Sequence, residues 1–163
     1  MLVLERYTAE DYNLYSQMVF NEQIMNMNMG RVFTDEEASM FFQVILSCNA
    51  QNNEYGFYKV YSVHNNDREY IGMGALTWND DCNAVEIEYM LLPQQWNKGY
   101  GTALVKLLVQ KAKESKKGVD IVAITDPTNI YSKRILRHAS FELVKQYVND
   151  DGELAELYKL TKQ

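Results

Sequence analysis

Two glycines spaced by one residue stand where the sequence changes from a strand pattern to a helical pattern. Residues 96–103 read WNKGYGTA, and Gly99 and Gly101 allow the backbone to approach a ligand with no Cβ atom in between. The helix that follows would direct its free N–H groups and the positive end of its dipole at that ligand. The pattern predicts a site for a pyrophosphate or similar anion, with the Thr102 hydroxyl as a further donor.

Glycines at this spacing also occur in ordinary turns, so the loop alone leaves that alternative open. Two other phosphate-binding loops are excluded. The third glycine of the dinucleotide pattern G-x-G-x-x-G is absent, and no Gly-Lys-Ser/Thr follows a four-residue gap as in a Walker loop.

Two carboxylates precede the loop within a predicted strand. Glu86 and Glu88 are two residues apart, so strand alternation places them on one side. A carboxylate beside the apolar Met90 would have a raised pKa and would be able to act as a base. The alternative is that one or both acids simply face solvent.

Two segments together carry a family resemblance. Residues 86–93 (EIEYMLLP) followed by 96–103, and residues 129–141 (NIYSKRILRHASF), are similar to the GNAT superfamily of acyl-CoA N-acyltransferases. The loop resembles the superfamily pattern [Q/R]-x-x-G-x-[G/A], and Trp96 at its first position is typical of the branch that includes the ribosomal-protein acetyltransferases RimJ and RimL. The second segment resembles the N-x-x-S-x-R…G-F motif.

The resemblance implies acetyl-CoA as the cosubstrate and acetyl transfer to a primary amine as the reaction. The backbone of Met90, Leu91 and Leu92 is implied to bind the pantetheine arm and to polarise the thioester carbonyl. Asn129 and Ser132 are implied to contact the pantetheine or thiol end. The pyrophosphate is implied to lie against the loop residues Trp96, Asn97, Lys98, Gly99, Tyr100, Gly101 and Thr102. Lys98, Lys133 and Arg134 would screen the phosphates, although a solvated helix face explains the last two nearly as well.

Glu86 occupies the position that often holds the general base of the family. The resemblance leaves the identity of the general acid open, because Leu136 stands where many members carry a tyrosine. A second departure is Ser140, which replaces the usual glycine before Phe141. Tyr131, another tyrosine or solvent would have to protonate the leaving thiolate. The missing tyrosine motivates one alternative, a non-catalytic acyl-CoA sensor. A nucleotide-binding regulator that uses the same glycine loop is another.

Composition sets further expectations. The net charge of −6 argues against a sequence-independent nucleic-acid binder, which needs a basic face. No apolar run reaches the roughly 18 residues of a membrane span, and no signal segment is evident, so a cytoplasmic protein with no membrane partner is expected. Cys48 and Cys82 are expected to be reduced, and His64 and His138 have no neighbours at metal-ligand spacing, so no metal is expected. The acids around Asp80 and Glu86 favour a cationic acceptor such as a protein N-terminus, a polyamine or an aminoglycoside.

The elements that must position these residues form one predicted domain over residues 1–163, as a monomer or homodimer. The fold class is α/β, with a GNAT-like, mixed, mostly antiparallel sheet and helices on both faces. Strands are expected at 1–7, 54–63, 70–78, 84–92, 119–125, 141–148 and 154–160, of which 119–125 is buried on both faces. Residues 84–125 should form a strand–helix–strand crossover with parallel strands.

Helices are expected from Thr8 to about Asn21, after Thr34, after Pro93 and from Pro127 to about Ala139. The apolar face of the helix after Thr34 is expected to consist of Met40, Phe41, Val44, Ile45 and Cys48. The stretch Ile24–Met29 is either a short helix or a loop. Its methionines would form a flexible lip on the acceptor pocket or pack into the core.

Overall fold

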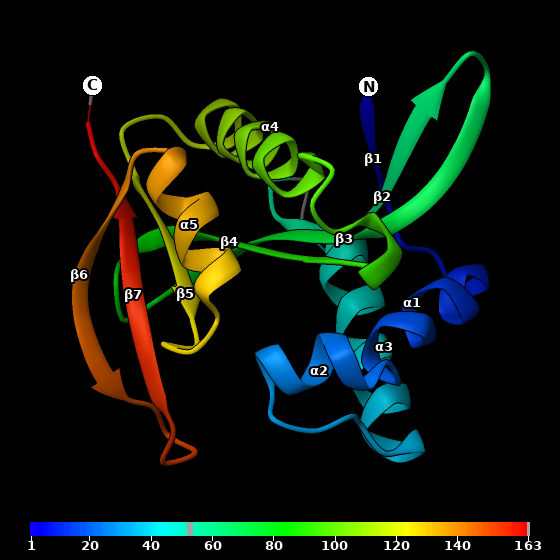
Figure 1. Cartoon of the computed structure of the whole chain (residues 1–163), viewed down its shortest axis with the longest axis horizontal. Coiled ribbons are helices and arrows are strands. Elements are labelled where there is room, and N and C mark those ends of the chain that lie inside the picture. Colours follow the sequence, from blue (N-terminus) through cyan, green and yellow to red (C-terminus); the bar gives the residue numbers. More distant parts are fainter. Residues whose placement is uncertain (52–53, 163) are drawn as a thin grey trace.

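One seven-stranded sheet runs through the molecule and carries a helical layer on each face (Figure 1). The computed structural model describes residues 1–51 and 54–162. The strand order is β1-β2-β3-β4-β5-β7-β6, and β4 with β5 is the only parallel pair among the described residues. The strands are β1 (Leu2–Arg6), β2 (Gly56–His64), β3 (Asp67–Asn79), β4 (Ala84–Leu91), β5 (Asp120–Thr125), β6 (Phe141–Val148) and β7 (Leu154–Leu160). The mixed, mostly antiparallel α/β fold is therefore confirmed.

The helices divide between the two faces of the sheet. They are α1 (Tyr12–Val19), α2 (Glu22–Asn28), α3 (Asp35–Gln51), α4 (Tyr100–Ser115) and α5 (Ile130–His138), with 3-10 turns at Ala9–Asp11 and Pro93–Gln95. α4 and α5 cover one face, where Leu104, Val105 and Leu108 of α4 are fully buried. α1, α2 and α3 cover the other face with a separate apolar cluster. Within the described residues, no helix is both long and apolar enough to cross a membrane.

The predicted face of α3 is wrong at two of its five positions. Met40 is 64% exposed and Val44 is 55% exposed, whereas Ala38 and Phe42 are buried in their place. Ile45 is buried as predicted, and Phe41 and Cys48 pack against the same cluster. The Phe42 ring stacks on Tyr15 of α1 at 5.0 Å between centroids, which fixes how the helix is rotated. Apolar residues occur around most of this helix, so their spacing alone did not determine which face turns inward.

The N-terminal helical region is divided in two. α1 ends at Val19, and the Asn21 side chain then accepts a hydrogen bond from the Ile24 N–H at 3.1 Å, which caps α2. The methionine-rich stretch is therefore helical. Met25 is buried in the core, as one of the two readings has it, and Met29 is 47% exposed. A lip on the acceptor pocket stays a prediction.

The parallel crossover from β4 to β5 is confirmed, and the two strands part soon after they meet. They pair only where Ala84, Val85 and Glu86 lie opposite Asp120, Ile121 and Val122. Beyond this point β5 continues beside β7, whereas β4 continues beside β3 up to Leu91. The sheet therefore has a gap along the second half of β4, where backbone groups on that edge have no strand partner.

The position of β4 beyond the gap depends on Gly72 of β3. An added Cβ atom at Gly72 would collide with the carbonyl oxygen of Met90 and lie 2.9 Å from the Leu91 Cα atom. Both are backbone atoms, so β4 itself would have to move. At Gly74, the nearest atom to an added Cβ would be a methyl group of Leu108 at 3.3 Å, which can shift by rotation.

We expect Gly72→Ala to lower the free energy of unfolding by about 1–3 kcal/mol, because it overpacks one strand against the next. Gly74→Ala is the matched control and should cost less than about 1 kcal/mol, since the unfolded chain also loses entropy. Urea denaturation of both variants measures the difference. Equal losses would mean that the approach of β3 and β4 at Met90 is not the constraint.

Candidate active site

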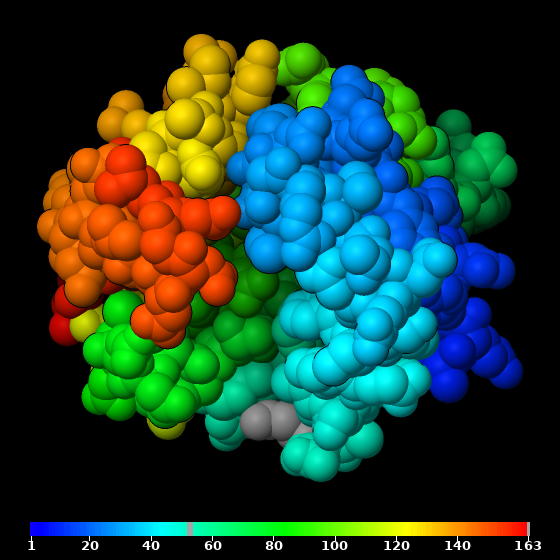
Figure 2. Space-filling view, turned by 90° about the horizontal axis from the view of Figure 1, so that it is seen from below, coloured from blue at the N-terminus to red at the C-terminus, as the bar shows by residue number. Residues whose placement is uncertain are grey.

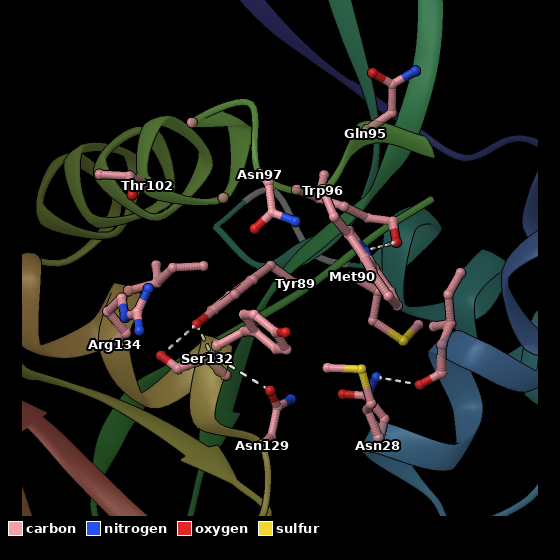
Figure 3. Close-up of a pocket in the computed structure, with 17 residues that line it drawn as sticks. Asn28, Tyr89, Met90, Gln95, Trp96, Asn97, Thr102, Asn129, Ser132 and Arg134 are labelled. Atoms are coloured by element: carbon pink, nitrogen blue, oxygen red, sulfur yellow. Dashed lines mark hydrogen bonds between the residues drawn. The ribbon is translucent and has the colours of Figure 1, made fainter. Parts of the chain in front are cut away.

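Two cavities meet at the gap between β4 and β5. The first, called the loop cavity, measures about 270 Å³ and is bordered by α2, the loop before α4 and α5 (Figure 3). The second, called the carboxylate cleft, measures about 260 Å³ and contains Glu86 and Glu88. Asn28, Tyr89, Met90 and Ser132 line both cavities. A ligand held in the loop cavity can therefore present one end to the carboxylate cleft.

The start of α4 forms one wall of the loop cavity. Gly99 precedes the helix with φ +83°, a left-handed conformation that glycine adopts without strain. No side chain caps this helix end, so its first N–H groups remain available beside Gly99 and Thr102, which both line the cavity. Sixteen residues of helix direct their dipole toward this point, which suits an anion.

The structure requires a glycine at position 101 for helix packing, whereas close approach of a ligand was the expected reason. An added Cβ atom there would lie 2.6 Å from Cδ1 of Ile135, which projects from α5. The missing side chain thus allows α4 and α5 to pack together where both border the loop cavity.

Most of the residues predicted to bind the cosubstrate do line the loop cavity, namely Met90, Leu91, Trp96, Asn97, Gly99, Gly101, Thr102, Asn129 and Ser132. Trp96 donates from Nε1 to the Leu91 carbonyl oxygen at 2.9 Å, which ties the loop back to the end of β4.

Three of the predicted residues lie away from the cavity lining. Leu92 is buried in the cluster beneath α1–α3. Tyr100 packs on the opposite core, and Lys98 donates to the Gln95 side chain at 3.3 Å. Their roles stay predictions.

The two basic residues of α5 differ in their surroundings. Lys133 donates to Glu156 at 3.2 Å and to the Pro127 carbonyl oxygen at 3.1 Å, so it is held within the protein. Arg134 lines the loop cavity instead. Across the described part of the chain, no three His, Cys, Asp or Glu side chains are grouped as a metal site would require.

A chain of hydrogen bonds joins α5 to β4 at the junction of the cavities (Figure 3). Asn129 caps α5 by accepting from the Ser132 N–H at 3.1 Å, and the hydroxyls of Ser132 and Tyr89 lie 2.7 Å apart. Burial raises the pKa of Tyr89 to about 12, although the bond with Ser132 acts in the opposite direction. The phenol therefore keeps its proton at neutral pH.

Tyr89 is the main residue that the sequence reasoning missed. Strand alternation places it on the opposite face from its neighbours Glu88 and Met90, toward the helix that carries Ser132. Strand alternation alone gave this signal, but the family pattern has its tyrosine after the position of Asn129. Asn28 was also missed, because nothing in the sequence places α2 above the end of β4.

The two carboxylates lie on one face of β4, as strand alternation predicted. Glu86 accepts from the Asn79 amide at 2.9 Å, and Glu88 accepts from the Thr77 hydroxyl at 3.3 Å. Burial, reinforced by the negative charge of Glu86, raises the pKa of Glu88 to about 7 despite its bond with Thr77. Burial also raises the pKa of Glu86, and Asn79 opposes that shift. Glu88 is an exposed residue by its accessible surface. The burial that raises its pKa is therefore the crowding of protein atoms around the cleft, and the carboxylate stays open to an incoming amine.

Comparison with known proteins bears on this geometry. A family model described as "Acetyltransferase (GNAT) domain" matches residues 1–142. The chain belongs to the GNAT acetyltransferase family. This assignment confirms the expected superfamily and, with it, an acyl-CoA-dependent acetyltransferase that uses acetyl-CoA. The RimJ/RimL branch stays a prediction.

Solved structures agree on the fold. A GNAT-family acetyltransferase from Bacillus anthracis matches with a TM-score of 0.79 and 16% identity over 98% of this chain and 93% of that chain. An acetyltransferase from Agrobacterium tumefaciens str. C58 matches with a TM-score of 0.80 and 17% identity over 99% and 91% of the two chains. The aminoglycoside acetyltransferase AAC(6')-Ib, in complex with coenzyme A and kanamycin, matches with a TM-score of 0.78 and 22% identity over 100% and 96%. No curated protein matches.

Proposed function

We propose that this protein transfers an acetyl group from acetyl-CoA to a primary amine, with Glu88 as the general base. The observation that carries the proposal is the junction of the two cavities. One cavity ends at an uncapped helix N-terminus and the other contains a carboxylate of raised pKa, and they share Tyr89, Met90 and Ser132. A donor in one cavity and an acceptor in the other would meet at the gap beside β4.

The acyl donor would occupy the loop cavity. The first N–H groups of α4 and the Thr102 hydroxyl would bind its pyrophosphate, and Arg134 would offset a further phosphate charge. The unpaired backbone edge of β4 near Met90 would bind the pantetheine arm and stabilise the oxyanion that forms when the amine attacks the thioester.

Proton transfer would divide between two residues. Glu88 would remove a proton from the acceptor ammonium, since its pKa near 7 allows it both to accept and to release a proton at neutral pH. As the C–S bond breaks and its electron pair moves onto sulfur, the Tyr89 hydroxyl would donate its proton to the leaving thiolate. Ser132 would orient the phenol. Tyr89 would thereby take the role left open by Leu136.

The acceptor would arrive as a cation. Burial, followed by the neighbouring Glu86, Cys82, Asp81 and Asp150, raises the pKa of Tyr147, so three acids lie near that ring, and one of them, Glu86, lines the cleft. These three carboxylates, called the rim acids, would attract an ammonium group. A protein N-terminus and a small-molecule amine both carry one. AAC(6')-Ib, which shares the fold, is solved with kanamycin, an amine of the second kind.

We further propose that residues 1–163 act as one domain. The family model ends at residue 142, but β7 lies between β5 and β6 in the same sheet and continues to Leu160.

Acetyl-CoA at 100 times its Kd should stabilise the protein by about 2.7 kcal/mol, because it binds only the folded state. For this chain length that is a rise in Tm of roughly 5–11 °C. Thermal unfolding with acetyl-CoA, ATP and NAD separately checks the specificity. An equal or larger shift with ATP or NAD would favour the nucleotide-binding regulator instead.

A pair of variants with the same charge change tests the phosphate site. Thr102→Asp should reduce the shift given by acetyl-CoA, because it places a negative charge in the loop cavity, although an acid in the first turn favours the helix itself. Lys113→Gln lies at the exposed far end of α4 and should leave the shift unchanged.

The initial rate with saturating acetyl-CoA should rise with pH through a pKa of about 7, because only ionised Glu88 can accept the amine proton. Glu88→Gln should lower kcat/KM by about 100-fold and remove this rise. Glu86→Gln should keep most of the activity and move the rise to lower pH, since the Glu86 charge helps to raise the pKa of Glu88. A large loss in Glu86→Gln alone would reverse the two roles.

Tyr89→Phe should lower kcat by about 100-fold with little change in the Kd for acetyl-CoA, because it removes a proton donor and leaves the ring in place. Tyr131→Phe is the matched control, as Tyr131 lines only the loop cavity and is 51% exposed. Stopped-flow release of CoA measures kcat, and calorimetry measures Kd. Full activity in Tyr89→Phe would leave Tyr131 or solvent as the proton source. Turnover of any amine by the unaltered protein would exclude the non-catalytic sensor.

A further inference from the structure

The carboxylates lie in a wall of apolar side chains. The strand register aligns Phe57 with Ala75 and Ala75 with Glu88 across β2, β3 and β4. On the other side of β4, Val122 lies opposite Glu86, and Ile124, two residues further along β5, projects from the same face and lines the cleft across the gap. Glu88 therefore has apolar side chains on both sides along the sheet, and the Thr77 hydroxyl is its hydrogen-bond donor.

Helix α2 and the residues after it supply the facing wall, which is also apolar. Met25, Met29 and Phe41 line the cleft from α2, the residue that follows α2 and α3. Figure 2 shows the hollow between the light-blue α2 region and the orange β6–β7 hairpin, with the green strands at its floor. A molecule that enters this hollow meets side chains of methionine, phenylalanine and isoleucine before it reaches Glu88.

Two of these apolar side chains are exposed without a covering partner. Ile124 is 36% exposed, although the three residues before it in β5 are buried. The expectation that 119–125 is buried on both faces is therefore wrong at Ile124, which lines the cleft, while Val119 and Asp120 at the start are half-buried. Met29 is 47% exposed. Exposed apolar side chains that converge on a concave site with a few polar groups are typical of a binding pocket for an apolar ligand.

The charge in the cleft is confined to its reaction end. Among the described residues that line it, Glu86 and Glu88 are the only charged side chains. They can accept one ammonium group, but the surrounding hydrocarbon offers few partners for hydroxyls or for a second amine. Of the acids near Tyr147, Asp81 and Asp150 do not line the cleft.

We propose that the preferred acceptor is a primary amine attached to an apolar body, such as an alkyl or aryl amine or a peptide N-terminus with an apolar first side chain. The inference rests on the proposed function and narrows its substrate class. An aminoglycoside or a polyamine would leave polar groups against Ile124, Met29 and Phe41 and would be a poorer acceptor.

A matched pair of amines tests this preference. Hexylamine and 1,5-diaminopentane have similar length and the same reacting group, and they differ in whether the far end is a methyl or an ammonium group. With saturating acetyl-CoA, kcat/KM for hexylamine should exceed that for 1,5-diaminopentane by at least about 10-fold, a difference typical of apolar contacts in a pocket. Kanamycin is a third acceptor. Peptide amides that begin with methionine or serine show whether the apolar body can be a residue side chain.

Substitution of the exposed wall residue ties the preference to the cleft. Ile124→Ser should raise KM for hexylamine by about 10-fold with little change in kcat, and should leave kcat/KM for 1,5-diaminopentane within about twofold. Val144→Ser removes an exposed apolar side chain of β6 (54%, against 36% for Ile124), which lines neither cavity, and should change nothing.

The outcomes separate the acceptor class from the proposed function. A higher kcat/KM for 1,5-diaminopentane or kanamycin would overturn the apolar acceptor and leave the acetyltransferase proposal standing, since the rim acids would then bind the second amine. An equal effect of Ile124→Ser on both amines would also overturn it. Binding of acetyl-CoA without turnover of any of the five acceptors would overturn both proposals.

Discussion

The parting of β4 from β5 is the constraint on which the rest of the site depends. Backbone amides and carbonyls inside a sheet are normally occupied by the neighbouring strand, so a sheet offers a ligand little to bind. Here the pairing stops after Glu86, and both cavities share side chains beside the gap, among them Tyr89 and Met90. The close approach of Gly72 to β4 keeps that strand beside β3 while its other edge is free. The same break therefore supplies polar groups that can act on a thioester.

The gap also explains why the two carboxylates differ in their electrostatics. Glu86 lies where the sheet is still continuous and has an amide donor in Asn79, whereas Glu88 lies beside the opening, with a longer hydrogen bond and hydrocarbon around it. Ionisation of Glu88 is disfavoured by burial and by the nearby Glu86 charge. The acidity of Glu88 thus follows from its place in the strand register.

The sequence allowed the prediction of most elements and of the loop cavity because those depend on local signals. Capping residues, strand alternation and the glycine pair each act within a few positions, and α4 and the segment around Gly99 lie as expected. The rotation of α3 could not be predicted, because it depends on the ring of Tyr15 in another helix. The Ser132–Tyr89 contact joins residues 43 positions apart, and no local pattern contains it. The exposure of Ile124 likewise depends on what lies across the cleft.

The side chains common to both cavities have a thermodynamic consequence. Each of three side chains, Asn28, Tyr89 and Met90, borders both cavities. Such a side chain cannot take one conformation for the donor and a different one for the acceptor at the same time. If binding of the first ligand changes the affinity for the second by some factor, binding of the second ligand must change the affinity for the first by the same factor. Helix α2 lies over the part of β4 that has left β5, and the side chains there border both cavities. Occupancy of one cavity therefore affects occupancy of the other, and the order in which the ligands bind depends on these shared side chains.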